Sequence, residues 1–299
     1  MSIQPTDGFV SANGLRLRYR RWSPATVKPF SPPILLLHGL ASSSHIWNFV
    51  APLLAQRGYS VTALDQRGHG ESDKPDSGYD FASIIADDRA AVQALAIERP
   101  IVVGHSWGAM VALEYAAMHG EDVTALVLVD GASNQFSLRP NWSREQALID
   151  LAPPRFAGTP RETFLSYFKH GPLGQQWSPE LEDSILHIVN VRPDDTVAPH
   201  LAFDNHLQII GAMWDQPLFD LYQQVHCPIT LIVADQEPPQ DAAEAFHIRM
   251  QMRDKGIAHI QTLQPSIRVV HMPNTIHDIP LQRPEQLAQE IISSIPPQV

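Results

Sequence analysis

A serine enclosed by glycines is the feature of this chain that most directly suggests chemistry. Residues 104–108 read Gly-His-Ser-Trp-Gly, between an apolar run, 101–103, and a helix-like run, 109–118. This order is typical of a nucleophile elbow, a turn so sharp that flanking side chains would collide, which leaves the serine hydroxyl exposed over a helix N-terminus. That end of a helix favours negative charge. The pattern predicts that Ser106 is a nucleophile, and the alternative is an ordinary tight turn.

A serine that attacks a carbonyl group also needs N–H groups that stabilise the resulting oxyanion. The apolar run 34–37 ends at His38-Gly39-Leu40. In an acyl-transfer enzyme of this architecture, the loop after such a strand turns a backbone N–H toward the serine. We therefore expect the N–H groups of Leu40 and Trp107 to form the oxyanion hole.

The general base is expected among the 14 histidines of the chain. His277 stands just after the last apolar run and before a C-terminal helix-like segment, which is the right place for a base that serves the elbow. His271 lies within that run and is expected to pack, and His105 lies inside the elbow. His277 is therefore the predicted general base, and later the general acid, of the reaction.

Two apolar patterns indicate the elements that must position these residues. Near the N-terminus, two strand-like runs flank Asn13-Gly14, which is the strongest short signal of a β-hairpin. Short aliphatic runs then alternate with segments long enough for helices, as is typical of a parallel sheet with helices on both faces. These runs are residues 34–37, 60–64, 101–103, 125–129, 229–233 and 267–270. Residues 284–295 complete the pattern with a predicted amphipathic helix.

The alternation lapses between residues 135 and 222, where aromatic residues and prolines are scattered through helix-like pieces. We expect this segment to be a helical cap, or lid, inserted into a core domain formed by residues 1–134 and 223–299. Most of its aromatic rings are expected to form the core of the cap, and those that face the pocket would suit an apolar acyl or aryl group. His206 is a candidate substrate-binding residue, although a structural role is the commoner one for such a histidine.

Composition excludes several classes of protein. The single cysteine, Cys227, can form neither an intramolecular disulfide nor a thiolate metal cluster, which fits a reducing, cytoplasmic location. A formal charge of −11 repels nucleic acid and anionic lipid. The sequence shows neither a signal peptide nor a membrane-spanning run, and its histidines lack zinc-ligand spacing. We therefore expect a protein with no metal, no cofactor and no nucleic-acid or membrane partner.

The chain resembles the α/β-hydrolase fold superfamily over nearly its whole length. The resemblance rests on His38-Gly39, on residues 65–72 (Asp-Gln-Arg-Gly-His-Gly-Glu-Ser), on the elbow at Ser106, and on residues 276–278 (Ile-His-Asp) with the Arg-Pro-Glu that follows at 283–285. It implies an eight-stranded, mostly parallel sheet with helices on both faces, Ser106 as nucleophile, a histidine base, and a cap over the carboxyl edge of the sheet. It also implies that residues 65–72 form a structural loop, which Asp65 and Arg67 fix.

The acid that orients His277 can come from either of two strands in this fold. In similar proteins it usually follows the strand after the cap, in a Gly-x-x-Asp pattern, and here Glu237 occupies that position within Ala-Asp-Gln-Glu at 234–237. The alternative is Asp130, which ends the run 125–129, because some esterases and dehalogenases of this fold carry their acid there. A carboxylate that ends a buried strand needs a partner. We favour Asp130 over Glu237.

These expectations together describe a serine hydrolase that cleaves a carboxylic ester of an apolar or aromatic small molecule through an acyl-enzyme intermediate. Similar proteins that open epoxides carry an aspartate at the elbow, so the serine argues against that activity. The alternatives are a lactonase or a carbon–carbon bond hydrolase with the same three residues. A small-molecule receptor of the same fold is the third possibility.

Overall fold

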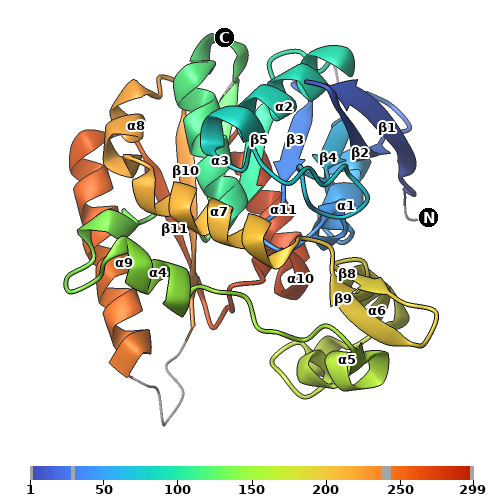
Figure 1. Cartoon of the computed structure of the whole chain (residues 1–299). Coiled ribbons are helices and arrows are strands. Elements are labelled where there is room, and N and C mark those ends of the chain that lie inside the picture. The colour runs from blue at the N-terminus through green and yellow to red at the C-terminus, as the bar shows by residue number, and fades with distance from the viewer. Residues whose placement is uncertain (1–2, 28–30, 237–243, 297–299) are drawn as a thin grey trace.

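One eight-stranded sheet organises the structure, a computed structural model that describes residues 3–27, 31–236 and 244–296 (Figure 1). Its strands lie in the order β1-β2-β4-β3-β5-β6-β10-β11. The bounds are β1 (Thr6–Ala12), β2 (Leu15–Trp22), β3 (Ile34–Leu37), β4 (Val61–Leu64), β5 (Ile101–His105), β6 (Ala125–Val129), β10 (Ile229–Asp235) and β11 (Arg268–Pro273). β2 pairs antiparallel with both β1 and β4, and the other neighbours are parallel. The predicted mostly parallel sheet is confirmed.

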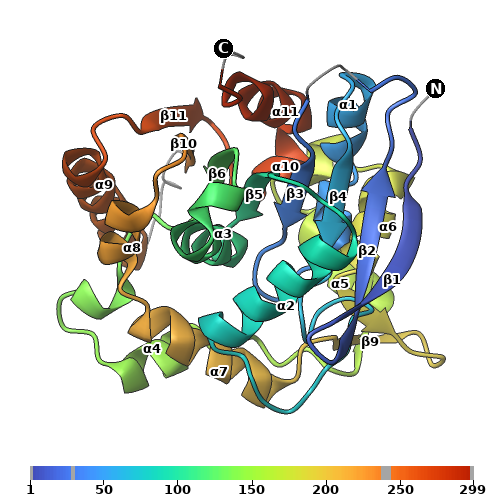
Figure 2. The same ribbon diagram turned by 90° about the horizontal axis from the view of Figure 1, so that it is seen from above.

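The parallel strands are apolar on both faces because helices cover both faces. Leu35 and Leu37 of β3 point into one layer, whereas Ile34 and Leu36 point into the other. The first layer contains α2 (Phe81–Ala94), α3 (Trp107–Met118), α8 (Leu218–Gln224) and α9 (Glu244–Leu263). The second contains η1 (Ser44–Trp47), α1 (Ala51–Gln56), α10 (Ile279–Gln282) and α11 (Pro284–Ser293). Figure 2 shows α1, α10 and α11 together on one side of the sheet and α2 and α3 on the other.

The sequence predicted a helical segment over residues 135–222, but the structure also contains strands there. This segment contains a second sheet of three antiparallel strands, in the order β7-β9-β8. Its elements are η3 (Phe136–Leu138), α4 (Arg144–Asp150), β7 (Thr159–Pro160), α5 (Arg161–Lys169), η4 (Gly174–Gln176), α6 (Pro179–Leu186), β8 (Val189–Val191), β9 (Thr196–Pro199), α7 (Phe203–Asp215) and α8. Strands of two to four residues are too short to leave a period in the sequence.

Two different cores hold this segment. Residues of α5, α6, β8 and β9, among them Leu165, Ile185 and Val197, form a small cluster of their own. Leu218 and Tyr222 of α8 instead join the main core beside α3. The division of the chain into residues 1–134 and 223–299 on one side and 135–222 on the other stays a prediction.

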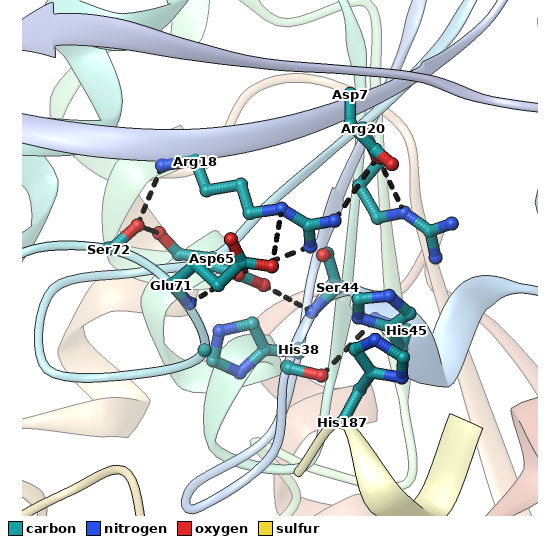
Figure 3. Close-up of polar contacts among 12 residues, drawn as sticks. Asp7, Arg18, Arg20, His38, Ser44, His45, Asp65, Glu71, Ser72 and His187 are labelled. Atoms are coloured by element: carbon teal, nitrogen blue, oxygen red, sulfur yellow. Dashed lines mark hydrogen bonds and ion pairs between the residues drawn. The ribbon is translucent and has the colours of Figure 1, made fainter. Parts of the chain in front are cut away.

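The loop 65–72 is fixed by buried charges, as Figure 3 shows for its first residue. The fully buried carboxylate of Asp65 accepts hydrogen bonds from the N–H groups of Ser44 at 2.7 Å and Glu71 at 3.0 Å. Arg18 of β2 lies 3.6 Å from the same carboxylate. Two further bonds, at 2.5 and 2.8 Å, join Arg67 to the buried Asp87 of α2. These contacts hold the loop against the sheet, in agreement with a structural role.

No helix in the described part of the chain combines the length and the apolarity that crossing a membrane requires.

Candidate active site

Ser106 occupies a sharp corner between β5 and α3. Its φ of 56° and ψ of −120° lie outside the regions that most residues adopt. Glycine flanks the corner because there is no room for side chains. A Cβ added at Gly104 would lie 2.1 Å from the carbonyl oxygen of Gly108, and one at Gly108 would lie 2.5 Å from that of His38. The corner therefore presents the serine side chain beyond the end of β5, at the N-terminus of α3.

Three side chains form a hydrogen-bonded chain at this corner. The Ser106 hydroxyl lies 2.9 Å from Nε2 of His277, and Nδ1 of His277 lies 2.6 Å from Oδ2 of Asp130. Asp130 directly follows β6, and His277 lies between β11 and α10. The structure thus brings together three residues that are far apart in the sequence. The His277 side chain is 54% exposed and that of Asp130 16%, so the carboxylate end is the sheltered one.

Electrostatics favour an ionised Asp130. Burial alone would raise the pKa of Asp130, but the hydrogen bond and the charge of His277, with the N–H of Ala234 at 2.9 Å, lower it overall. For His277, partial desolvation by the surrounding protein favours the neutral ring, but the hydrogen bond and the charge of Asp130 outweigh this effect, so the pKa of His277 is raised. With Nδ1–H donated to the carboxylate, Nε2 is free to accept the serine proton.

His105, next to Ser106, contacts the residue that hydrogen-bonds to the serine. Its Nε2–H donates to the carbonyl oxygen of His277 at 2.9 Å, and the two rings lie 4.9 Å apart. Burial and the neighbouring His277 lower the pKa of His105 to about 4, so the ring is neutral near pH 7. Sequence reasoning placed His105 inside the elbow without assigning it this contact, which spans 172 residues of chain.

The loop after β3 lies directly beside Ser106. A Cβ added at Gly39 would lie 3.1 Å from the Cβ of Ser106. His38 holds this loop, because its Nδ1–H donates to the Gly39 carbonyl at 2.8 Å while Nε2 accepts the N–H of Gln66 at 3.0 Å. Leu40 follows Gly39 in this loop, so its backbone begins next to the residue that lies beside Ser106.

His69 connects the two backbone segments that are expected to form the oxyanion hole. Its Nε2 accepts the N–H of Ala41 at 3.1 Å, and its Nδ1–H donates to the carbonyl oxygen of Arg67 at 2.9 Å. The same ring stacks on Trp107, with centroids 5.3 Å apart and planes inclined by 25°. Sequence analysis missed this residue, and the only signal was its place in the Gly-His-Gly of the structural loop.

We expect the His69→Phe variant to lower kcat by about tenfold to a hundredfold while KM changes little. A phenyl ring keeps the stacking on Trp107 but leaves the Ala41 N–H without its acceptor, so the Leu40 loop shifts. A displaced oxyanion donor costs less than a deleted one, for which about 10²–10³ is usual. Steady-state kinetics with the melting temperature measured in parallel test this, and a lowered melting temperature with an unchanged kcat would contradict it.

The structure describes the contacts of Asp235 but not those of Glu237. Glu237 lies outside the described residues. Asp235 accepts a hydrogen bond from Nδ1 of His271 at 2.8 Å and pairs with Arg253 at 3.0 Å. The expectation that His271 packs is wrong, because its side chain is 49% exposed. Among the described carboxylates, Asp130 is the one that contacts His277 through a hydrogen bond.

A cavity of about 950 Å³ lies between the Ala41 loop and the segment 151–206. It begins beside His69 and extends over apolar and aromatic side chains of α5 and of the loop before it. His206, 7% exposed, is among its walls, and burial lowers the pKa of this histidine to about 4. Ser106 does not line the cavity, but Ala41 and Ser42 do, and they belong to the loop whose Gly39 lies beside the serine. Its size is that of a pocket for a small organic ligand.

Metal ligation finds no support in this region or elsewhere in the described part of the chain, where no three His, Cys, Asp or Glu side chains are grouped to hold an ion.

Comparisons with known proteins agree on the fold. A family model described as "alpha/beta hydrolase fold" matches residues 32–226. AB hydrolase superfamily protein YisY of Bacillus subtilis is 31% identical over 166 residues, which cover 52% of this chain and 59% of YisY. Epoxide hydrolase A of Mycobacterium tuberculosis is 36% identical over 124 residues, covering 41% of this chain and 37% of that protein. The match thus spans less than two thirds of either relative.

Two solved structures are similar over nearly the whole chain. One is that of E-2-(acetamidomethylene)succinate hydrolase, with a TM-score of 0.71 and 22% identity, covering 98% of this chain and 99% of that one. The other is the thioesterase domain from the curacin biosynthetic pathway, with a TM-score of 0.73 and 20% identity, covering 97% and 99%. At these identities the likeness concerns the fold alone.

Proposed function

The chain belongs to the α/β-hydrolase fold family, and on that premise we propose that it is a serine hydrolase that cleaves a carboxylic ester of an apolar or aromatic small molecule. The observation that carries the proposal is the hydrogen-bonded chain Ser106–His277–Asp130, at 2.9 and 2.6 Å. A hydroxyl, an imidazole and a carboxylate in this order are the groups that acyl transfer requires.

Each residue has a role in the proposed reaction. His277 takes the proton of Ser106 as the oxygen attacks the carbonyl carbon, and Asp130 stabilises the imidazolium that forms. The N–H groups of Leu40 and Trp107 receive the oxyanion. The imidazolium then protonates the leaving alkoxide, which leaves an acyl-serine ester. A water molecule deprotonated by His277 hydrolyses this ester and restores the hydroxyl.

Relatives named as epoxide hydrolases raise a second possibility, which the chemistry of serine disfavours. Attack of the Ser106 oxygen on an epoxide carbon would form an ether, and an ether has no carbonyl for water to attack. The enzyme would then be blocked after one turnover. Attack on an ester, thioester or lactone carbonyl instead forms an acyl-enzyme that water can hydrolyse, so acyl transfer is the activity that we propose.

The test of this function is a fluorophosphonate probe together with the hydrolysis of p-nitrophenyl acetate and butyrate. We expect the probe to label Ser106, identified by mass spectrometry of the modified peptide, and both esters to be turned over many times. Absence of both labelling and turnover would refute the proposal. Ester binding with at most one slow turnover would favour a small-molecule receptor.

The pH dependence of kcat/KM should report the environment of His277. Only the neutral ring can accept the serine proton, and Asp130 raises the pKa of this histidine above its ordinary value of 6.5. We therefore expect kcat/KM to rise with pH through a midpoint above 6.5. The residual activity of an Asp130→Asn variant should show a lower midpoint. A wild-type midpoint below the ordinary value would mean that Asp130 does not control the base.

A further inference from the structure

The 950 Å³ cavity beside the Ala41 loop has a distinctive distribution of charge. The chain carries a formal charge of −11, yet none of the described residues that line the cavity is an aspartate or a glutamate. Arg155 is the one residue among them with a formal charge. The cavity therefore differs in sign from the rest of the protein.

The histidines of the cavity do not change this balance. Burial lowers the pKa of His200 and of His206 to about 4, and it lowers the pKa of His69 well below its ordinary value. All three rings are therefore neutral near pH 7. Arg155 remains the only fixed positive charge on the described walls.

Arg155 is an exposed residue whose guanidinium contacts an aromatic ring. It lies in the loop between α4 and α5, which runs below α7 in Figure 1, and its guanidinium stacks over the ring of Phe203 at 4.6 Å. No ion pair or hydrogen bond to Arg155 occurs within residues 3–27, 31–236 and 244–296. Asp204, the neighbour of Phe203, is exposed and is not part of the cavity wall. Stacking on a ring leaves the N–H edge of a guanidinium open to a planar anion.

The other walls of the cavity are mainly apolar. They include Phe156, Phe164, Phe168 and Leu201. A ligand that fills this space would place an apolar body against these side chains and an anionic group against the guanidinium. A carboxylate matches the two parallel N–H groups of arginine.

Building on the proposed function, we propose that the natural ester has an apolar body that ends in a carboxylate, and that Arg155 binds this carboxylate. The cavity then selects substrates by charge at Arg155, while Ser106, which lies beside Gly39 of the loop that continues to Ala41, acts at the ester. Arg155 is a specificity-determining residue in this arrangement and takes no part in the acyl transfer itself.

The experiment compares esters that differ only in the terminal group. The p-nitrophenyl monoesters of succinate, adipate and suberate are matched with p-nitrophenyl butyrate, hexanoate and octanoate. For wild type, we expect kcat/KM for the best carboxylate ester to exceed that of its neutral partner by about tenfold. The ratio of kcat/KM for the carboxylate ester to that for the neutral ester should be highest in wild type. It should fall progressively in Arg155→Lys, Arg155→Gln and Arg155→Glu, and Arg155→Glu should prefer the neutral ester.

Arg139→Gln is the matched control. Arg139 also stacks on an aromatic ring, that of Trp142 at 3.8 Å, but it does not line the cavity. The ratio should stay at its wild-type value in this variant. Equal ratios in Arg155→Gln and wild type, or a wild-type preference for the neutral esters, would overturn the inference.

A binding measurement separates this inference from the proposed function. Calorimetric titration of the Ser106→Ala protein with monomethyl adipate and with methyl hexanoate needs no turnover. We expect the carboxylate ligand to bind about tenfold more tightly, and the added Arg155→Gln substitution to remove the difference. If wild type hydrolyses no ester, the proposed function is wrong, and this titration alone decides the role of Arg155. Equal affinities would refute it.

Discussion

Substitution of Ser106 by alanine is expected to abolish fluorophosphonate labelling and to lower kcat for p-nitrophenyl butyrate by roughly four orders of magnitude or more. Among the described residues, the Ser106 hydroxyl is the nucleophile that lies within hydrogen-bonding distance of His277, at 2.9 Å, so its removal is expected to eliminate the covalent pathway. The remaining rate would come from binding and from the oxyanion hole, which still polarise the carbonyl toward water.

A second variant makes this prediction sharper. His277→Ala should be impaired to a similar extent, and the double variant should be no slower than either single one, because a serine without its base and a base without its serine are both inactive. Additive losses would show that the two residues act in separate steps. A Ser106→Ala protein with the wild-type rate would place the reaction elsewhere.

Asp130→Asn is expected to lower kcat by about 10⁴-fold without unfolding the protein. One oxygen of Asp130 accepts the Ala234 N–H at 2.9 Å, and the amide oxygen of asparagine can keep this bond. The amide nitrogen would then face Nδ1 of His277, which must accept a hydrogen bond and so carry its proton on Nε2. In that tautomer the ring cannot take the proton of Ser106.

Glu237→Gln is the comparison variant, because Glu237 holds the position of the acid in many similar proteins. We expect its kcat to stay within about twofold of wild type, since Asp130 already occupies the hydrogen-bonding position at Nδ1 of His277. Circular dichroism of both variants checks that folding is intact. A large loss in Glu237→Gln with a small one in Asp130→Asn would exchange the two assignments.

Local signals in the sequence predicted most of the sheet and of the candidate site. Asn13-Gly14 marked the hairpin between β1 and β2, and the glycines around Ser106 marked the elbow. Asp130 could be proposed because it ends an apolar strand at the edge where parallel strands finish. In each case the local structure requires a particular residue type, because it involves a positive φ, a close approach of two backbone segments or a buried charge. Such a requirement can be recognised in the sequence.

Features that depend on distant parts of the chain could not be predicted in this way. His271 alternates with apolar residues and was expected to pack, but β11 is the last strand of the sheet, and the sequence does not reveal which strand is the edge. The bond from the Ala41 N–H to His69 joins residues 28 apart, and that from His105 to His277 joins residues 172 apart. Such contacts follow from the packed fold and have no period or spacing of their own.

The backbone at Ser106 and Asp130 has a consequence for how this chain evolves. Their φ angles of 56° and 44° are ones that glycine adopts freely and that other residues adopt at a cost of about 1–3 kcal/mol. The chain is therefore less stable than it could be at these two residues of the candidate site. A lineage released from selection for turnover would gain stability by drifting to glycine there, so a descendant that keeps both side chains has remained under selection for chemistry.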